Sequence, residues 1–128
     1  MIAYLQWRTN QNKLKLDLFE KRYAVYRATT EFIGTIYREG TAKDESLQRF
    51  ALAIGPAQFL FEADVDAQIN EIYKRALDMS VNRAYRSDLP AGTELKQLAH
   101  EHDEHLGWFL EQGPMIAKKF APYLKLTH

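Results

Sequence analysis

Apolar residues recur along this chain every three or four positions, which is the spacing of one face of an α-helix. The first forty residues carry two adjacent stripes of this kind. Their members are Leu14, Leu18, Val25, Phe32 and Ile36 in one stripe, and Phe19, Tyr26, Ile33 and Tyr37 in the other. Two adjacent stripes make a broad apolar face, so the pattern predicts one long helix that ends at Arg38, before Gly40, and packs against two neighbours.

Three further helices are predicted from the same spacing in the rest of the chain. Asp44, Asp64 and Thr93 stand where these helices would begin, and all three are residue types that cap helix N-termini. Because proline lacks a backbone donor, we expect Gly55-Pro56 to kink or break the second helix and Gly113-Pro114 to interrupt the fourth.

The length and composition fit one small helical domain. With short loops between them, the four helices predict an all-α, up-and-down four-helix bundle with a long N-terminal helix, in a single domain over residues 1–128. Only residues 13–18 alternate like a strand, and they lead directly into the helical pattern. The chain has no Cys, which excludes disulfides, thiolate metal sites and cysteine nucleophiles and is typical of a reducing compartment such as the cytoplasm.

Charge is distributed unevenly, although its sum is zero. Residues 1–38 contain seven Lys and Arg against three Asp and Glu, a net charge of +4, so the rest of the chain carries −4. A basic segment on an acidic body suggests an anionic surface or partner near the N-terminus. Attraction between the two parts within the bundle is the alternative, and the near-zero total argues against nucleic acid as a partner.

Aromatic and basic residues occur together at the start of the chain. They are Tyr4, Trp7, Arg8, Lys13 and Lys15. Aromatics with polar tips are enriched at the level of lipid head groups, and positive charge is enriched on the cytoplasmic flank of a membrane anchor. The apolar residues ahead of this group are far fewer than the ~20 that span a bilayer. We therefore expect residues 1–12 to project from the bundle, next to the inner face of a membrane or against a second subunit.

An N-terminal motif extends through the same region. It comprises Trp7-Arg8-Thr9-Asn10, the sequence KLKLDLFEKRY over residues 13–23, and Val25-Tyr26. This motif, together with residues 59–61, residues 71–76 and Trp108-Phe109, resembles a group of small uncharacterised bacterial proteins. The resemblance implies a hydrophobic segment ahead of the motif in many members and no established activity. Because this chain begins six residues before Trp7, we expect that a membrane anchor is missing from it or was never present.

Three of the four histidines lie in residues 100–105, beside three carboxylates. Histidines one helical turn apart can share a metal, which makes His102 and His105 candidate ligands. The segment lacks His-Glu-x-x-His, because residue 104 is Glu, and the chain lacks the Glu-x-x-His of di-metal bundles. Helical geometry also places His102 in the apolar stripe and His100 on the opposite side. A charged, solvated face with one buried histidine and no metal is therefore the preferred interpretation.

Arg22 lies within the apolar arc of the first helix, where a charged group requires a partner. Glu62 and Asp66 are expected to supply it as a buried ion pair that fixes the register of the helices. The alternative is a polar pocket around Arg22 that accepts a small anion.

Trp108 lies about 100° away from its neighbour Phe109, which is on the core stripe of the fourth helix. A large aromatic on a polar face can mark a contact surface. Alternatively, Trp108 covers the expected kink at Gly113-Pro114 or packs on the last segment of the chain.

No motif assigns a catalytic residue or a cofactor. The sequence predicts a non-enzymatic helical interaction domain near the cytoplasmic membrane face, which associates with itself as a homo-oligomer. The alternative from another class is a metal-binding enzyme or sensor that uses residues 100–105.

Overall fold

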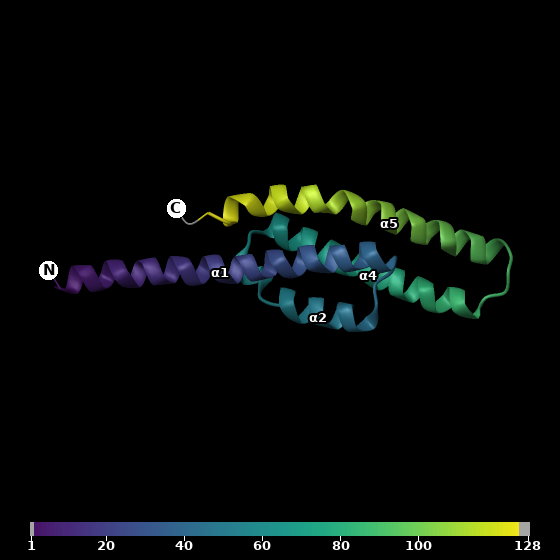
Figure 1. Ribbon diagram of the computed structural model, residues 1–128, viewed down its shortest axis with the longest axis horizontal. Helices are drawn as coiled ribbons and strands as arrows, with labels where there is room; N and C mark the ends of the chain where they lie inside the picture. Colours follow the sequence, from purple (N-terminus) through teal and green to yellow (C-terminus); the bar gives the residue numbers. More distant parts are fainter. Residues whose placement is uncertain (1, 126–128) are drawn as a thin grey trace.

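The computed structural model describes residues 2–125, and these form the all-α bundle that the sequence predicts (Figure 1). The long helices are α1 (Ile2–Glu39), α2 (Asp44–Ile54), α4 (Ala63–Asp88) and α5 (Thr93–Phe120). A four-residue helix, α3 (Ala57–Leu60), joins α2 to α4, and a 3-10 turn, η1 (Ala121–Tyr123), follows α5. Successive long helices run in opposite directions, so the topology is up-and-down (Figure 1).

The ends of the helices differ from the sequence prediction by one or two residues. Asp44 and Thr93 are the first residues of their helices and Asp64 is the second of α4, so none of the three is the N-cap. The two aspartates instead lie in the first turn, where a negative charge is favoured by the helix dipole. The end of α1 is as expected: Gly40 adopts a φ of 72°, which glycine tolerates best, and its N–H donates to the Ile36 carbonyl at 2.8 Å.

The two Gly-Pro pairs behave differently. Gly55-Pro56 ends α2, as predicted. Pro114 does not interrupt α5, which continues through it to Phe120, so the predicted break there is wrong. Pro114 and Leu110, whose carbonyl loses its helical donor, are both exposed, and water can therefore reach that carbonyl.

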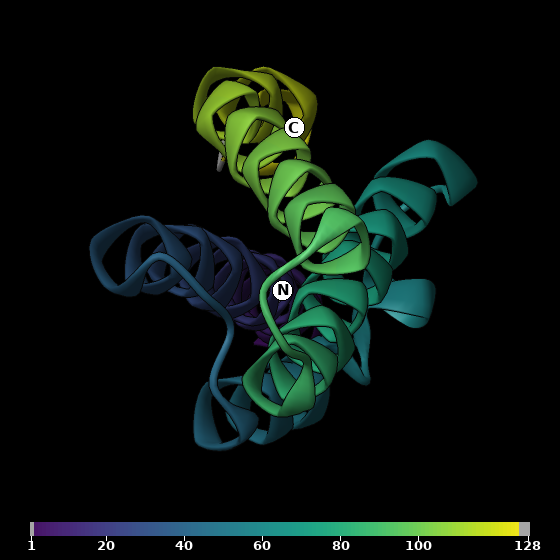
Figure 2. The ribbon, with the colours of Figure 1, turned by 90° about the vertical axis from the view of Figure 1, so that its right-hand side faces the viewer.

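The hydrophobic core lies where α1, α2, α4 and α5 face one another (Figure 2). The rings of Phe32 on α1 and Phe50 on α2 stack with their centroids 4.2 Å apart and an angle of 6° between their planes. The other buried apolar side chains come mainly from α4 and α5. They include Val65, Ile69, Ile72, Ala76, Met79, Phe109, Ile116 and Phe120.

The N-terminal half of α1 extends beyond the other helices (Figure 1). We call residues 2–18 the projecting segment, because none of them is buried and only Gln11 is half-buried. Leu14 and Leu18 are 60% and 38% exposed, so their predicted place in the core is wrong. The reason is that α1, with 38 residues, is longer than the helices that pack against it, and its first buried side chain is Val25.

Candidate functional site

One apolar stripe runs along the whole of α1 and changes from exposed to buried. In the projecting segment it consists of Tyr4, Trp7, Leu14 and Leu18, all exposed. Toward the C-terminus of the helix, the same face carries the buried side chains Val25, Thr29, Phe32 and Ile36. When the polar Gln11 and Arg22 are counted with these residues, the spacing of three or four is maintained across the boundary, so the exposed apolar residues lie on the same side of α1 as those that pack in the core.

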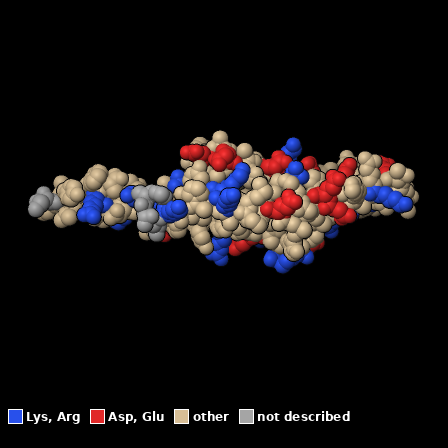
Figure 3. Space-filling view, turned by 90° about the horizontal axis from the view of Figure 1, so that it is seen from above, with Lys and Arg blue, Asp and Glu red and all other residues tan. Residues whose placement is uncertain are grey.

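The aromatic and basic side chains of the projecting segment are exposed to solvent. The rings of Tyr4 and Trp7 stack at 6.3 Å. Arg8, Lys13 and Lys15 are exposed, and no ion pair within residues 2–125 involves them. Figure 3 shows Lys and Arg side chains along the projecting part, whereas the body of the molecule carries both acidic and basic groups. No helix among the described residues is long and apolar enough to cross a membrane.

Arg22 has other partners than the carboxylates predicted for it. Its Nε donates to the carbonyl of Leu60 at 2.9 Å, and its guanidinium lies 5.1 Å from the centre of the Tyr123 ring. Within the described part of the chain it forms no ion pair with Glu62 or Asp66. The carbonyl of Leu60 is available to Arg22 because α3 ends at this residue and the chain continues in an extended conformation. Glu62, one of the two predicted partners, is exposed to solvent instead. Arg22 therefore fastens the end of α3 and the turn after α5 onto α1.

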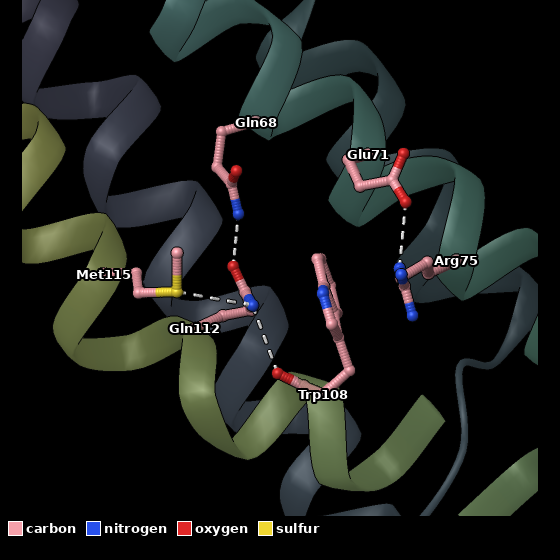
Figure 4. A network of polar contacts seen from close by, with 6 residues as sticks. All are labelled: Gln68, Glu71, Arg75, Trp108, Gln112 and Met115. Carbon is pink, nitrogen blue, oxygen red and sulfur yellow. Dashed lines mark hydrogen bonds and ion pairs between the residues drawn. The ribbon is translucent and has the colours of Figure 1, made fainter. Parts of the chain in front are cut away.

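Trp108 contacts another helix of the same chain. The guanidinium of Arg75, on α4, lies 4.3 Å from the centre of its ring, and Arg75 is itself paired with Glu71 (Figure 4). Beside the ring, the buried Gln112 donates to the Trp108 carbonyl at 3.2 Å and accepts a hydrogen bond from Gln68. The half-buried Trp108 thus joins α5 to α4 rather than presenting a free contact surface or covering a kink.

The histidines of α5 divide as the helical geometry predicts. His102 is buried, whereas His100 is exposed and pairs with Glu104 at 2.9 Å. His105 is half-buried, and no group of three metal-binding side chains is found among residues 2–125. The pKa of His102 is lowered, first by burial and then by the positive charge of Arg86, so the ring is neutral near pH 7.

A hollow of about 540 Å³ lies beside His102, and we call it the His102 hollow. Its walls come from the turn after α1, the last turns of α4 and the first turns of α5. They include Thr41, Arg83, Arg86, Ser87 and Leu95. Sequence analysis missed this site. The one visible signal is that Arg83, Arg86 and Ser87 fall on nearly the same side of one helix end, but the loop and helix that complete the site are distant in sequence.

No family model matches this sequence, and no curated protein or solved structure matches it either. The resemblance of the N-terminal motif to a bacterial family stays a prediction.

Proposed function

We propose that this protein is a non-enzymatic helical interaction module that pairs with a second copy of itself through the projecting segment. The observation that supports this is the exposed stripe Tyr4, Trp7, Leu14 and Leu18, which continues a stripe that helices cover inside the bundle. Apolar residues separated by alternating steps of three and four are the pattern through which two helices pair side by side. Gln11, at the centre of the stripe, is a polar residue of the kind that sets the register of such a pair.

The size of the surface predicts weak pairing. The projecting segment forms about 25 Å of helix. Full burial of each large apolar side chain contributes about 1.5–3 kcal/mol, while association itself costs about 4–15 kcal/mol. Pairing is therefore expected to depend on protein concentration. Because Arg8, Lys13 and Lys15 repel their counterparts in a second copy, added salt should strengthen it.

The basic residues support a second candidate, binding to the anionic inner face of a membrane. Tyr4 and Trp7 are of the type that enters the head-group layer, and each Lys or Arg near an anionic surface contributes about 1 kcal/mol. This attraction weakens with salt, which is the opposite of the salt effect expected for pairing.

Sedimentation equilibrium at several protein concentrations and two salt concentrations tests the proposal. We expect a reversible dimer in the wild type that is strengthened by salt and lost in the double variant Leu14→Glu, Leu18→Glu. The matched control is Leu52→Glu, which places the same charge at an 83% exposed leucine of α2 and should leave the dimer intact. A wild type that stays monomeric at all concentrations overturns self-pairing.

Sedimentation with anionic vesicles separates the second candidate. Vesicle binding that salt abolishes and that Arg8→Gln, Lys13→Gln and Lys15→Gln together remove would favour the membrane. Equal and negligible sedimentation of wild type and triple variant would exclude it.

A further inference from the structure

The His102 hollow contains buried polar atoms that have no partner within residues 2–125. They are the hydroxyl oxygen of Thr41 and Nδ1 of His102, and both residues are only 9% exposed. Buried polar groups are nearly always hydrogen-bonded, because leaving one unsatisfied costs about 1–3 kcal/mol. Thr41 and His102 both line the hollow, one from the turn after α1 and the other from α5, so a molecule bound there would lie next to two polar groups whose hydrogen bonds are incomplete.

The charge of the hollow is positive. Arg83 and Arg86 both line it, and among residues 2–125 no carboxylate does. Neither arginine takes part in an ion pair in the part of the chain that the structure describes. Two guanidinium groups in one hollow without an acidic partner attract an anion with several oxygens, because each guanidinium can donate two parallel hydrogen bonds.

One of the two arginines is held in place by the protein. Nε of Arg86 donates to Oδ1 of Asn82 at 2.7 Å, and Nδ2 of the buried Asn82 donates to the Leu98 carbonyl on α5 at 2.9 Å. This chain of bonds fixes the guanidinium of Arg86 at the wall before any ligand arrives. A donor that is already oriented loses less conformational entropy when it binds.

We propose that the His102 hollow binds the phosphate group of a small molecule. Arg83 and Arg86 supply the charge and the donors for a dianion, and the Thr41 hydroxyl donates to a third oxygen. Nδ1 of the neutral His102 accepts a hydrogen bond from a hydroxyl group of the ligand. Leu95 and Ala99 form an apolar wall against which the organic part lies. This site lies in the body of the molecule, away from the projecting segment, and does not depend on self-pairing.

Titration with inorganic phosphate and with pyrophosphate, followed by amide NMR at constant ionic strength, tests the proposal. We expect saturable shifts at Gly40, Thr41 and His102, and an affinity about tenfold or more weaker in Arg83→Gln and in Arg86→Gln, since each loses a charge-assisted hydrogen bond. The matched control is Arg49→Gln, an exposed arginine of α2 that lines a different groove. Its affinity for phosphate should equal that of the wild type.

Three results would overturn the proposal. They are shifts that grow linearly without saturation, shifts centred on Arg38 and Arg49, and equal losses of affinity in all three variants. Because Arg86 supports Asn82, the melting temperature of each variant is measured first. If Arg86→Gln does not fold, the comparison of the exposed Arg83 with Arg49 decides the question.

Discussion

The guanidinium of Arg75 lies 4.3 Å from the centre of the Trp108 ring, so a cation–aromatic contact joins α4 to α5. Glu71 holds Nε of Arg75 at 2.9 Å and so fixes the guanidinium over the ring. This contact explains how a tryptophan can stand off the core stripe of α5 without being a free surface.

A double-mutant cycle measures this contact. With Arg75→Gln and Trp108→Leu, we expect a coupling free energy of about 0.5–2 kcal/mol in urea unfolding. The control cycle pairs Trp108→Leu with Arg27→Gln, since Arg27 forms an exposed pair with Glu31 on α1. Coupling of similar size in both cycles would show that the Arg75 contact contributes nothing specific.

Removal of Arg22 should destabilise the bundle without any involvement of a carboxylate. Arg22→Gln loses the bond to the Leu60 carbonyl and the contact with the Tyr123 ring, so we expect a loss of about 1 kcal/mol in the free energy of unfolding. Glu62→Gln and Asp66→Asn should change it by less than about 0.5 kcal/mol. A loss in Glu62→Gln as large as that in Arg22→Gln would restore the ion pair expected from the sequence.

Two phenylalanines make a matched pair for the core. Phe50 is 2% exposed and stacked on Phe32, whereas Phe59, on the short α3, is 82% exposed. Phe50→Ala leaves a cavity and should cost about 3–5 kcal/mol, while Phe59→Ala should cost less than about 0.5 kcal/mol. Chemical denaturation at one pH measures both. A costly Phe59→Ala would mean that this ring is covered in solution.

The lowered pKa of His102 makes stability depend on pH. Burial and the charge of Arg86 lower the pKa of His102 below the ordinary 6.5. A hydrogen bond with the backbone of Gly40 and the charge of Asp103 raise this pKa, but by less. His102 then binds a proton more tightly in the unfolded chain than in the folded one. The free energy of unfolding is therefore unaffected by this group above pH 6.5, and it decreases as the pH falls through 6.5 toward the lower pKa of the folded state.

Melting temperatures between about pH 7.5 and pH 5.5, in a buffer without phosphate, test this dependence. His102→Gln should lower stability at the upper pH and then lose less of it on acidification than the wild type does. His100→Gln, which changes an exposed histidine, should retain the wild-type slope. Parallel slopes in wild type and His102→Gln would contradict the assignment to His102.

The positions of the helices could be predicted from the sequence because helical spacing is a local property. The burial of Val25 and the opposite exposures of His100 and His102 follow from that spacing. The exposure of Leu14 could not be predicted in the same way. Periodicity identifies the face on which a leucine lies, but not whether a neighbouring helix is long enough to reach it.

The partners of buried polar groups depend on contacts between distant segments. Arg22 bonds to a carbonyl that is free only because α3 ends at Leu60, and a pattern of residue types does not indicate a free carbonyl. The His102 hollow likewise combines a loop with two helix ends that lie more than forty residues from it in sequence. Its unpartnered Thr41 can be recognised only once the burial of its hydroxyl is known.

The unbroken course of α1 has a mechanical consequence. From Ile2 to Ile33 the helix contains no glycine or proline, so no hinge separates the projecting segment from the part that packs in the core. A force applied at Trp7 is therefore transmitted along a stiff rod to Phe32, which stacks directly on α2. A partner that binds the projecting segment would therefore exert its force on α2 and the core through the rigid helix α1.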